Sequence, residues 1–380
     1  MKNMDSRTSP EKTQSTAIDY DLHGIVGVRL LDPSKEDAAA VADQLGALRG
    51  ELRREPDILI RFRKELALSG MNYLGLDSAG FTDQGFYILR SGKSSVKARI
   101  PFDEIGKTCE IVCESGLSSV PLLLAIVNIT FMKKNRIPLH ASGFTFNGIG
   151  ALVAGWAKGG KTEALLAFTN HGAAYVGDEW VILSEDGGTM YGIPEPIRVW
   201  DWQLKYMPEL KSMIPARKRA FFKTIRLVDE IHRLSKKSRL PLPFLSLGDE
   251  AMPALKRQLN IRLPPREIFN GRFLTSSRLD KIFFLLSREE QTIEIHQCSP
   301  EDVARRMSNC NLFEQAPFFE NYKAFKFAFP KSRNEFLENV PRLQESLLLN
   351  ALKGKDSFIV FHPYPVSFEL LYEKMVPYLT

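Results

Sequence analysis

Eight consecutive residues near the middle of the chain have the composition of a loop that binds phosphate groups. The segment 155–162 reads Gly-Trp-Ala-Lys-Gly-Gly-Lys-Thr. Its glycines lack side chains, so backbone N–H groups there can approach a phosphate chain closely. Lys161 would then bridge the outer phosphates, and the hydroxyl of Thr162 would coordinate Mg²⁺. The segment therefore predicts a site for ATP or another nucleoside triphosphate.

All eight residues of this phosphate loop are candidates for contact with the nucleotide: Gly155, Trp156, Ala157, Lys158, Gly159, Gly160, Lys161 and Thr162. The ring of Trp156 could stack on the nucleotide base or only cover the following helix. We interpret Lys158 as a surface lysine rather than as a second phosphate ligand. The alternative interpretation of the whole segment, a glycine turn between unrelated elements, is disfavoured by the sequence on either side.

A phosphate loop needs a strand before it and a helix after it, because the helix N-terminus carries a partial positive charge. Residues 149–154 are small and apolar and predict the strand, while residues 161–168 predict the helix. Before the strand, Asn147-Gly148 predicts a type I′ hairpin turn, because both residue types tolerate positive φ angles. The strand that precedes this turn is expected at 137–146. The sequence thus predicts both elements that the loop requires.

Residues 173–183 are an apolar stretch that predicts another strand, and two adjacent carboxylates, Asp178 and Glu179, interrupt it. A buried charge is unfavourable unless it meets a cation or a proton. Nucleotide sites need an acidic side chain at the end of an apolar strand, where it can hold magnesium or its water ligands. We therefore expect the pair to be functional, with a solvated edge strand as the alternative.

From His140 to Leu183 the sequence resembles the catalytic core of HPr kinase/phosphorylase and related serine kinases. The residues that carry the resemblance are Leu139-His140-Ala-Ser-Gly143, the hairpin, the phosphate loop followed by Glu163, and the acidic pair that begins seventeen residues after Lys161. Residues 196–200 add a weaker similarity. The resemblance covers a small share of the chain but is specific in order and spacing.

This resemblance implies the phosphoenolpyruvate-carboxykinase type of P-loop fold, in which strands flank the loop in a mixed sheet. It implies that Lys161 holds the phosphates and that Thr162 and Glu179 help to hold Mg²⁺. Asp178 would be the general base that takes the proton from an acceptor serine, and His140 would lie near the site. The implied activity is ATP- and Mg²⁺-dependent transfer of phosphate to a serine hydroxyl of a protein or peptide. A homo-oligomer is implied as a possibility.

The sequence departs from the family pattern at two points. Glu179 stands where the family usually has a second aspartate, and its longer side chain could change the metal site. The downstream signature Glu-(Ile or Val)-Arg-Gly is absent from the sequence, and Glu195 and Arg198 are the nearest residues. The phosphorylase reaction and HPr as acceptor are therefore not expected. Two alternatives stay open: a nucleotide-binding regulatory or assembly protein with weak or no kinase activity, and a small-molecule kinase.

The expected fold is α/β, a P-loop kinase core accompanied by a small N-terminal α+β domain. Its expected divisions are a flexible tail at 1–19, the N-terminal domain at 20–118 and the kinase-like domain at 119–380. A basic, proline-interrupted insertion is expected at about 201–279. Within it, residues 217–239 predict a solvated amphipathic helix rather than a nucleic-acid-binding surface. Its inward-facing residues are expected to be Phe221, Phe222, Ile225, Val228 and Ile231.

The overall composition is typical of a folded, cytoplasmic protein. Of the 380 residues, 44% are hydrophobic and 25% are charged. The longest apolar run, at 120–132, is too short to span a bilayer, so no membrane segment is expected. Four cysteines do not make a disulfide framework in so long a chain, and Cys109 and Cys113 are spaced too widely for a redox motif. A reducing cytoplasm and no nucleic-acid partner are expected, and His362 is interpreted as structural.

Overall fold

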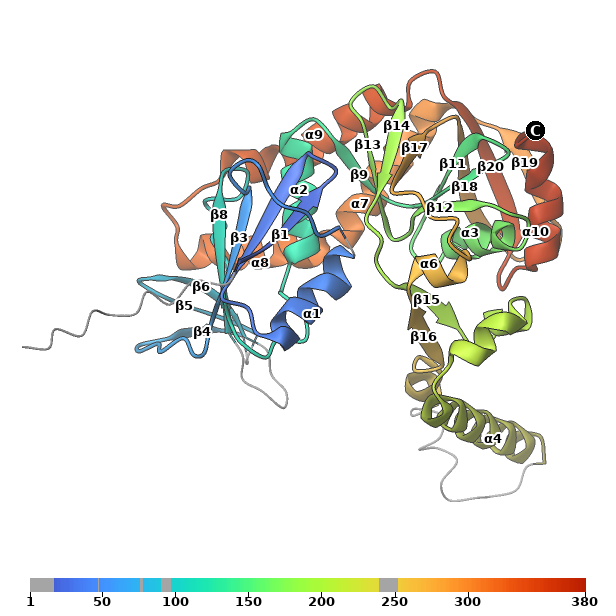
Figure 1. Cartoon of the computed structure of the whole chain (residues 1–380), viewed down its shortest axis with the longest axis horizontal. Coiled ribbons are helices and arrows are strands. Elements are labelled where there is room, and N and C mark those ends of the chain that lie inside the picture. The colour runs from blue at the N-terminus through green and yellow to red at the C-terminus, as the bar shows by residue number, and fades with distance from the viewer. Residues whose placement is uncertain (1–16, 47, 76–77, 90–96, 239–251) are drawn as a thin grey trace, which may run out of the picture. The chain divides into compact units, whose positions relative to one another are not determined.

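The computed structural model describes residues 17–46, 48–75, 78–89, 97–238 and 252–380. They form a mixed α/β protein with several sheets (Figure 1). The chain divides into two compact units. The first unit contains residues up to 134 together with 315–343, and the second contains residues 135–314 together with 344–380. No helix among the described residues is both long and apolar enough to cross a membrane.

The first unit is built on a sheet with the strand order β1-β2-β3-β8-β7-β6-β5-β4. Its strands are β1 (Ala17–Leu22), β2 (Val26–Leu31), β3 (Ile58–Arg63), β4 (Asn72–Leu74), β5 (Ala79–Thr82), β6 (Gly85–Leu89), β7 (Lys97–Arg99) and β8 (Cys109–Glu114). The central pairs β2–β3 and β3–β8 are parallel, and the other pairs are antiparallel. The helices of this unit are α1 (Lys35–Leu45), α2 (Leu123–Lys133) and α8 (Ala316–Ala328), and α9 (Glu335–Leu352) contributes residues to both units.

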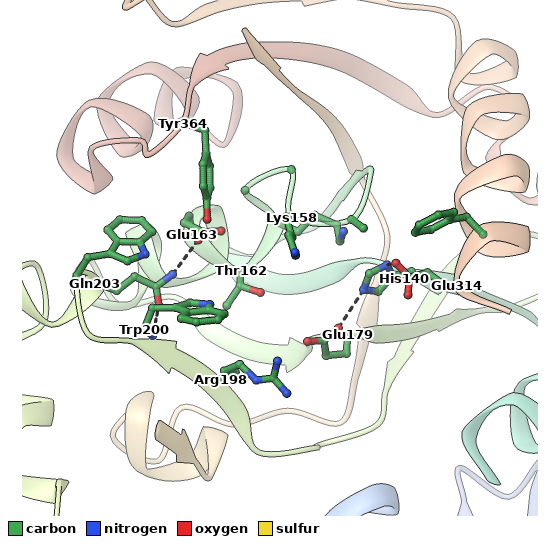
Figure 2. Close-up of a pocket in the computed structure, with 16 residues that line it drawn as sticks. His140, Lys158, Thr162, Glu163, Glu179, Arg198, Trp200, Gln203, Glu314 and Tyr364 are labelled. Atoms are coloured by element: carbon green, nitrogen blue, oxygen red, sulfur yellow. Dashed lines mark hydrogen bonds and ion pairs between the residues drawn. The ribbon is translucent and has the colours of Figure 1, made fainter. Parts of the chain in front are cut away.

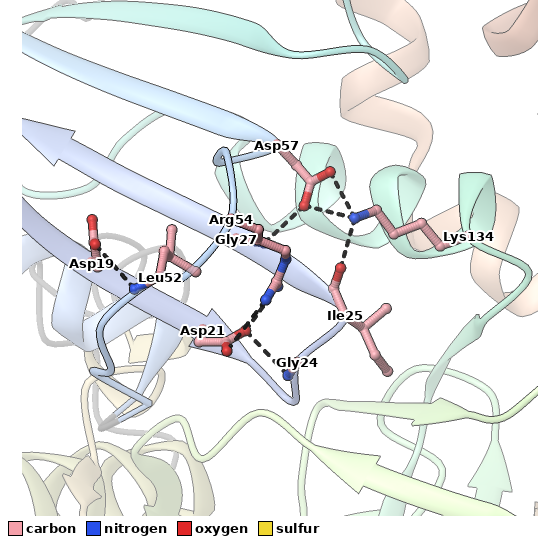
Figure 3. A network of polar contacts seen from close by, with 9 residues as sticks. All are labelled: Asp19, Asp21, Gly24, Ile25, Gly27, Leu52, Arg54, Asp57 and Lys134. Atoms are coloured by element: carbon pink, nitrogen blue, oxygen red, sulfur yellow. Dashed lines mark hydrogen bonds and ion pairs between the residues drawn. The ribbon is translucent and has the colours of Figure 1, made fainter.

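A polar network closes the β1–β2 hairpin of the first unit (Figure 3). Asp21 accepts hydrogen bonds from Arg54 and from the backbone of Gly24. Asp57 accepts one from the backbone of Gly27, and the ammonium group of Lys134 lies 2.7 Å from its carboxylate. Lys134 immediately follows α2, so the network ties the end of this helix to the N-terminal sheet. The backbone N–H groups of Gly24 and Gly27 thereby find hydrogen-bond acceptors.

The observed division of the chain differs from the expected boundary after residue 118. Helix α2 contacts α1 and β2, which explains why it groups with the N-terminal sheet. Residues 315–343 return to the first unit, where α8 contacts β5. The expected tail at 1–19 lies outside the described residues up to residue 16, and residues 17–19 already belong to β1. A segment that packs against a distant part of the chain, as residues 315–343 do, has no local sequence pattern that would predict this contact.

The second unit contains a mixed sheet with the order β12-β10-β11-β18-β20-β19 and a smaller antiparallel sheet with the order β17-β14-β13-β9. Their strands are β9 (Ile137–His140), β10 (Ser142–Phe146), β11 (Ile149–Gly155), β12 (Ala174–Gly177), β13 (Trp180–Leu183), β14 (Thr189–Gly192), β17 (Ser276–Arg278), β18 (Lys281–Arg288), β19 (Glu294–Gln297) and β20 (Asp356–Pro363). In the mixed sheet, β11 runs parallel to β18 and antiparallel to β10. Strand β11 is central and almost wholly buried, as its continuous apolar sequence indicates.

Two stretches that were expected as single strands each divide between the two sheets. The stretch 137–146 becomes β9 in the smaller sheet and β10 in the mixed sheet, with the break at Ala141. The stretch 173–183 becomes β12 in the mixed sheet and β13 in the smaller one, with the break at Asp178 and Glu179. Glu179 has a φ of 63°, which is uncommon for a residue with a side chain. The acidic pair therefore lies where the sheets separate.

Helices complete the second unit. They are α3 (Lys161–Thr169), α4 (Ala216–Ser238), α6 (Pro265–Ile268), α7 (Pro300–Glu314) and α10 (Phe368–Met375), with the short helices η1 (Gln203–Lys205), η2 (Pro208–Met213) and η3 (Val376–Tyr378). A further strand pair joins β15 (Ile197–Trp200) to β16 (Asn260–Leu263). The core of this unit joins Ala151 and Val153 of β11 to Leu165 and Phe168 of α3. Strand β11 and helix α3 are thus fixed on both sides of the phosphate loop.

Helix α4 is buried less extensively than its sequence pattern predicted. Phe222 and Ile225 are buried, whereas Phe221, Val228 and Ile231 are exposed by 38, 43 and 55%. The five residues therefore do not share one buried face. Phe222 belongs to the core of the second unit, and the remaining apolar side chains of the expected face do not.

Gly150 offers a test of how tightly β11 is held. A Cβ atom added there would overlap the carbonyl oxygen of Arg278, a backbone atom that cannot move alone. We expect Gly150→Ala to lower the free energy of unfolding by about 1–3 kcal/mol or more, the usual effect of overpacking. Gly50→Ala is the control, since its added Cβ would lie 3.8 Å from Asp21. Thermal and denaturant unfolding would measure the stability of both variants relative to the parent. Equal stability of the two variants would contradict the packing described for β11.

Candidate functional site

The backbone of the phosphate loop needs glycine at specific points. The loop joins β11 to α3, and Gly160, directly before the helix, has a φ of 91°. A Cβ atom on Gly160 would lie 2.9 Å from the ring of His362, and one on Gly159 would lie 2.9 Å from the carbonyl oxygen of Trp156. Side chains at these positions would therefore disturb the turn. The loop leaves backbone N–H groups at the N-terminus of α3, where anions are favoured.

Lys161 is buried at the start of α3 and reaches back across the loop. Its ammonium group donates hydrogen bonds to the carbonyl oxygens of Gly155 and Trp156, at 3.2 and 3.0 Å. Burial lowers the pKa of Lys161, while the charges of Glu179 and Asp178 oppose that effect. The lysine is thus held at the first residues of the loop, close to the acidic pair.

Asp178 is buried beneath the loop, with 3% of its surface exposed. Ser142 donates a hydrogen bond of 2.5 Å to its carboxylate, and the hydroxyl of Thr162 lies 3.2 Å from each of its two oxygens. Burial, followed by repulsion from Glu179, raises the pKa of Asp178 to about 7. The arrangement brings together a hydroxyl of the loop and a carboxylate from the break between β12 and β13.

His140 lies between two carboxylates. Its Nε2 atom is 2.9 Å from Oε2 of Glu179, and its Nδ1 atom is 3.0 Å from Oε1 of Glu314. Burial favours the neutral ring, but the hydrogen bond to Glu179 and the ion-pair contact with Glu314 outweigh it, so the pKa of His140 is raised. The same contact with His140 lowers the pKa of Glu179. Glu314, at the end of α7, was not recognised in the sequence, because nothing local distinguishes it from a surface residue.

These groups surround a cavity of about 560 Å³. The lining residues are His140, Ala157, Lys158, Gly159, Gly160, Lys161, Thr162, Glu163, Glu179, Arg198, Trp200, Trp202, Gln203, Phe313, Glu314 and Tyr364. Asp178 does not itself line the cavity, but its carboxylate contacts the hydroxyl of Thr162, which does. The side chain of Trp156 is 45% exposed, and its ring lies 4.8 Å from that of Phe313. The structure thus gathers most of the expected residues around one space.

Glu163 forms a second polar cluster on the other side of Thr162 (Figure 2). It is buried, and it accepts a hydrogen bond of 2.8 Å from the side-chain amide of Gln203. The amide oxygen of Gln203 in turn accepts one from the backbone of Trp200, also at 2.8 Å. Burial raises the pKa of Glu163, and it raises the pKa of Tyr364, beside this carboxylate, to about 12. This cluster fixes the start of η1 against the phosphate loop.

His362 supports the loop from behind. Its Nε2 atom lies 3.0 Å from the carbonyl oxygen of Gly159, and its Nδ1 atom lies 2.8 Å from that of Pro363. The residue is fully buried and comes from β20, far along the chain from the loop. A structural role agrees with these contacts, although its position against the phosphate loop could not be seen in the sequence.

A comparison with protein-family models finds no match for the chain, and a comparison with curated proteins finds none either.

The buried carboxylate of Asp178 should make stability depend on pH. Its pKa is about 7 in the folded chain and near the ordinary value in the unfolded chain, so unfolded chains lose this proton first as the pH rises. Ionisation of Asp178 therefore opposes folding between about pH 4 and pH 7. Asparagine does not ionise, so the stability of Asp178→Asn relative to the parent should increase over this range, by on the order of a few kcal/mol.

Chemical denaturation at several pH values in EDTA would measure this difference. Glu185→Gln is the control, because half of that side chain is exposed. A difference between Asp178→Asn and the parent that stays flat from pH 4 to pH 7 would contradict the burial of an ionisable group at this position.

Proposed function

We propose that this chain is an ATP- and Mg²⁺-dependent phosphotransferase similar to HPr serine kinases, built on a P-loop core of the HPr kinase and phosphoenolpyruvate-carboxykinase type. One observation carries the proposal. The hydroxyl of Thr162 lies 3.2 Å from both oxygens of the buried Asp178, and Lys161 lines the cavity beside them. A hydroxyl, a carboxylate and a lysine in this relation are what P-loop enzymes use to hold the outer phosphates and their metal ion.

The oxygen donors suit magnesium. Mg²⁺ prefers hard oxygen ligands and usually takes only one or two from the protein, with phosphates and waters completing the shell. Thr162 and Asp178 supply such a pair, and the described part of the chain contains no cluster of three or more His, Cys, Asp or Glu side chains placed to hold a metal. When bound, the ion would neutralise charge on the phosphates and orient them. Thr162 and Asp178 would hold it.

The positions of the two carboxylates favour exchanging the roles that the resemblance implied. Asp178 lies under Thr162, whereas Glu179 lines the cavity and is hydrogen-bonded to His140. A general base must come within hydrogen-bond distance of the proton that it accepts. We therefore assign Glu179 to the acceptor hydroxyl and Asp178 to the metal. The lowered pKa of Glu179 is acceptable for this role, because phosphoryl transfer demands little basicity.

In this mechanism the acceptor oxygen attacks the terminal phosphorus as the bond to the leaving diphosphate breaks. The acceptor proton passes to the carboxylate of Glu179, which becomes neutral, and His140 orients that carboxylate through its hydrogen bond. Glu314 holds the opposite nitrogen of the ring, so His140 stays in place during the transfer. The acceptor class, a serine hydroxyl of a protein or peptide, follows from the resemblance.

Lys161→Met tests nucleotide binding. Removing the buried ammonium group should weaken MgATP binding by about ten- to a hundredfold, since hydrogen bonds to charged groups contribute about 1.5–3 kcal/mol. Isothermal titration calorimetry would measure the affinity for MgATP, with Lys374→Met as control because Lys374 is exposed. Unchanged affinity in Lys161→Met, or no binding by the parent, would reject the site. Binding by the parent without turnover would favour a nucleotide-binding regulatory protein.

A pair of conservative variants tests the assigned roles. Asp178→Asn should raise the Mg²⁺ concentration needed for half-maximal ATP binding about tenfold or more. Glu179→Gln should leave that concentration unchanged and lower turnover of MgATP by about 10²–10⁴-fold. Turnover would be followed as labelled phosphate transferred to the chain or to water, with Glu185→Gln as control. The opposite outcome, with Mg²⁺ dependence altered in Glu179→Gln alone, would restore the roles implied by the resemblance.

A further inference from the structure

The cavity has two sides of different composition, and Thr162 lies between them (Figure 2). One side presents His140, Glu179 and Glu314, which are charged. The other presents aromatic rings around the polar side chains of Glu163 and Gln203. The aromatic residues on that side are Trp200, Trp202 and Tyr364, and we call them the aromatic wall.

The phosphate loop has a direction, and the direction decides what each side can bind. In such loops the lysine contacts the outer phosphates, while the backbone cradles the inner ones at the start of the helix. Here the ammonium group of Lys161 lies at Gly155 and Trp156, and Glu179 and Glu314 are near enough to influence it electrostatically. The terminal phosphate would therefore face the charged side. The nucleoside end of the bound ligand would extend in the opposite direction, past Thr162 and Glu163.

We propose that the aromatic wall is the stacking site for the nucleobase, an inference that rests on the proposed function. Tyr364 lies beside Glu163, and Trp200 is linked to Glu163 through Gln203, so the wall borders the path that a nucleoside would take past Glu163 (Figure 2). Base stacking on aromatic side chains needs a π face and no particular hydrogen-bonding pattern. Stacking on this wall therefore selects a nucleoside triphosphate over inorganic phosphates, without choosing between adenine and guanine.

The wall is held in position before any ligand arrives. The rings of Trp202 and Tyr364 are 6.2 Å apart at an interplanar angle of 82°, and the ring of Trp202 also lies 6.2 Å from that of Phe368. The backbone N–H of Trp200 donates a hydrogen bond to Gln203, which holds the main chain at this point of the wall. Tyr364 is 46% exposed, so its ring is accessible to a ligand. A preformed aromatic surface binds with less loss of conformational entropy than a mobile one.

A second aromatic pair competes for the same role. Trp156 and Phe313 have rings 4.8 Å apart, and Phe313 precedes Glu314 at the end of α7. Phe313 lines the cavity next to Glu314, on the charged side where the terminal phosphate would lie, and Trp156 contacts Phe313 without itself lining the cavity. Trp156 therefore supplies a matched comparison, since the same substitution can be made at both tryptophans.

The test compares two ligands on four proteins. MgATP and magnesium tripolyphosphate, which lacks a nucleoside, would be titrated calorimetrically into the parent chain, Trp200→Leu, Trp200→Phe and Trp156→Leu. Trp200→Leu should bind MgATP about tenfold more weakly or worse, as expected for a lost stacking partner, and should bind tripolyphosphate like the parent. Trp156→Leu should change the affinities for the two ligands by the same factor. Trp200→Phe should restore most of the MgATP affinity, which excludes misfolding as the cause.

The outcomes separate this inference from the proposed function. If the parent binds tripolyphosphate as tightly as MgATP, or if Trp200→Leu retains full MgATP affinity, the wall does not hold the base and the loop remains a phosphate site. A selective loss of MgATP affinity in Trp156→Leu would move the base to the charged side and overturn the assignment. Failure of the parent to bind either ligand would reject the nucleotide site and the aromatic wall together.

Discussion

The burial of Asp178 is the constraint on which the rest of the site depends. A carboxylate with 3% exposure must find hydrogen-bond donors or a cation, because burial of an unpaired charge is strongly unfavourable. Ser142 and Thr162 supply the donors from β10 and from the start of α3. Three segments that are separate in the sequence thereby meet at the carboxylate of Asp178. This carboxylate lies where the mixed sheet and the smaller sheet separate, and the cavity opens beside it.

Local sequence patterns predicted the elements that surround Asp178. Asn147-Gly148 predicted the hairpin between β10 and β11, and the structure confirms it with both residues at positive φ. The apolar run at 149–154 predicted β11, and the glycines at 155, 159 and 160 predicted the loop that precedes α3. Hydrophobic periodicity does not record which sheet a strand joins, however. For that reason the divisions at Ala141 and at Glu179 were missed, although the acidic pair lies at one of them.

Residues of the site that are close in sequence to the loop were predictable, and distant ones were not. Lys161, Thr162 and Glu179 were expected from their types and spacing, His140 was expected from the resemblance, and all four line one cavity. Glu314 and Tyr364 also line the cavity, and His362 contacts the loop. Glu314 comes just before residues 315–343, which return to the first unit, and the other two come after them. Their roles depend on tertiary contacts alone, such as the 3.0 Å between His362 and Gly159.

The central claim is that this cavity binds a magnesium–nucleotide complex for phosphate transfer. Its most direct test is calorimetric titration of the unmodified chain with ATP, with and without Mg²⁺, followed by detection of the labelled terminal phosphate in the same samples. The account predicts saturable binding that strengthens with Mg²⁺ and label that appears on a hydroxyl group. An absence of binding under both conditions would contradict it, because a buried lysine, a loop hydroxyl and a buried carboxylate would then meet without a phosphate to hold.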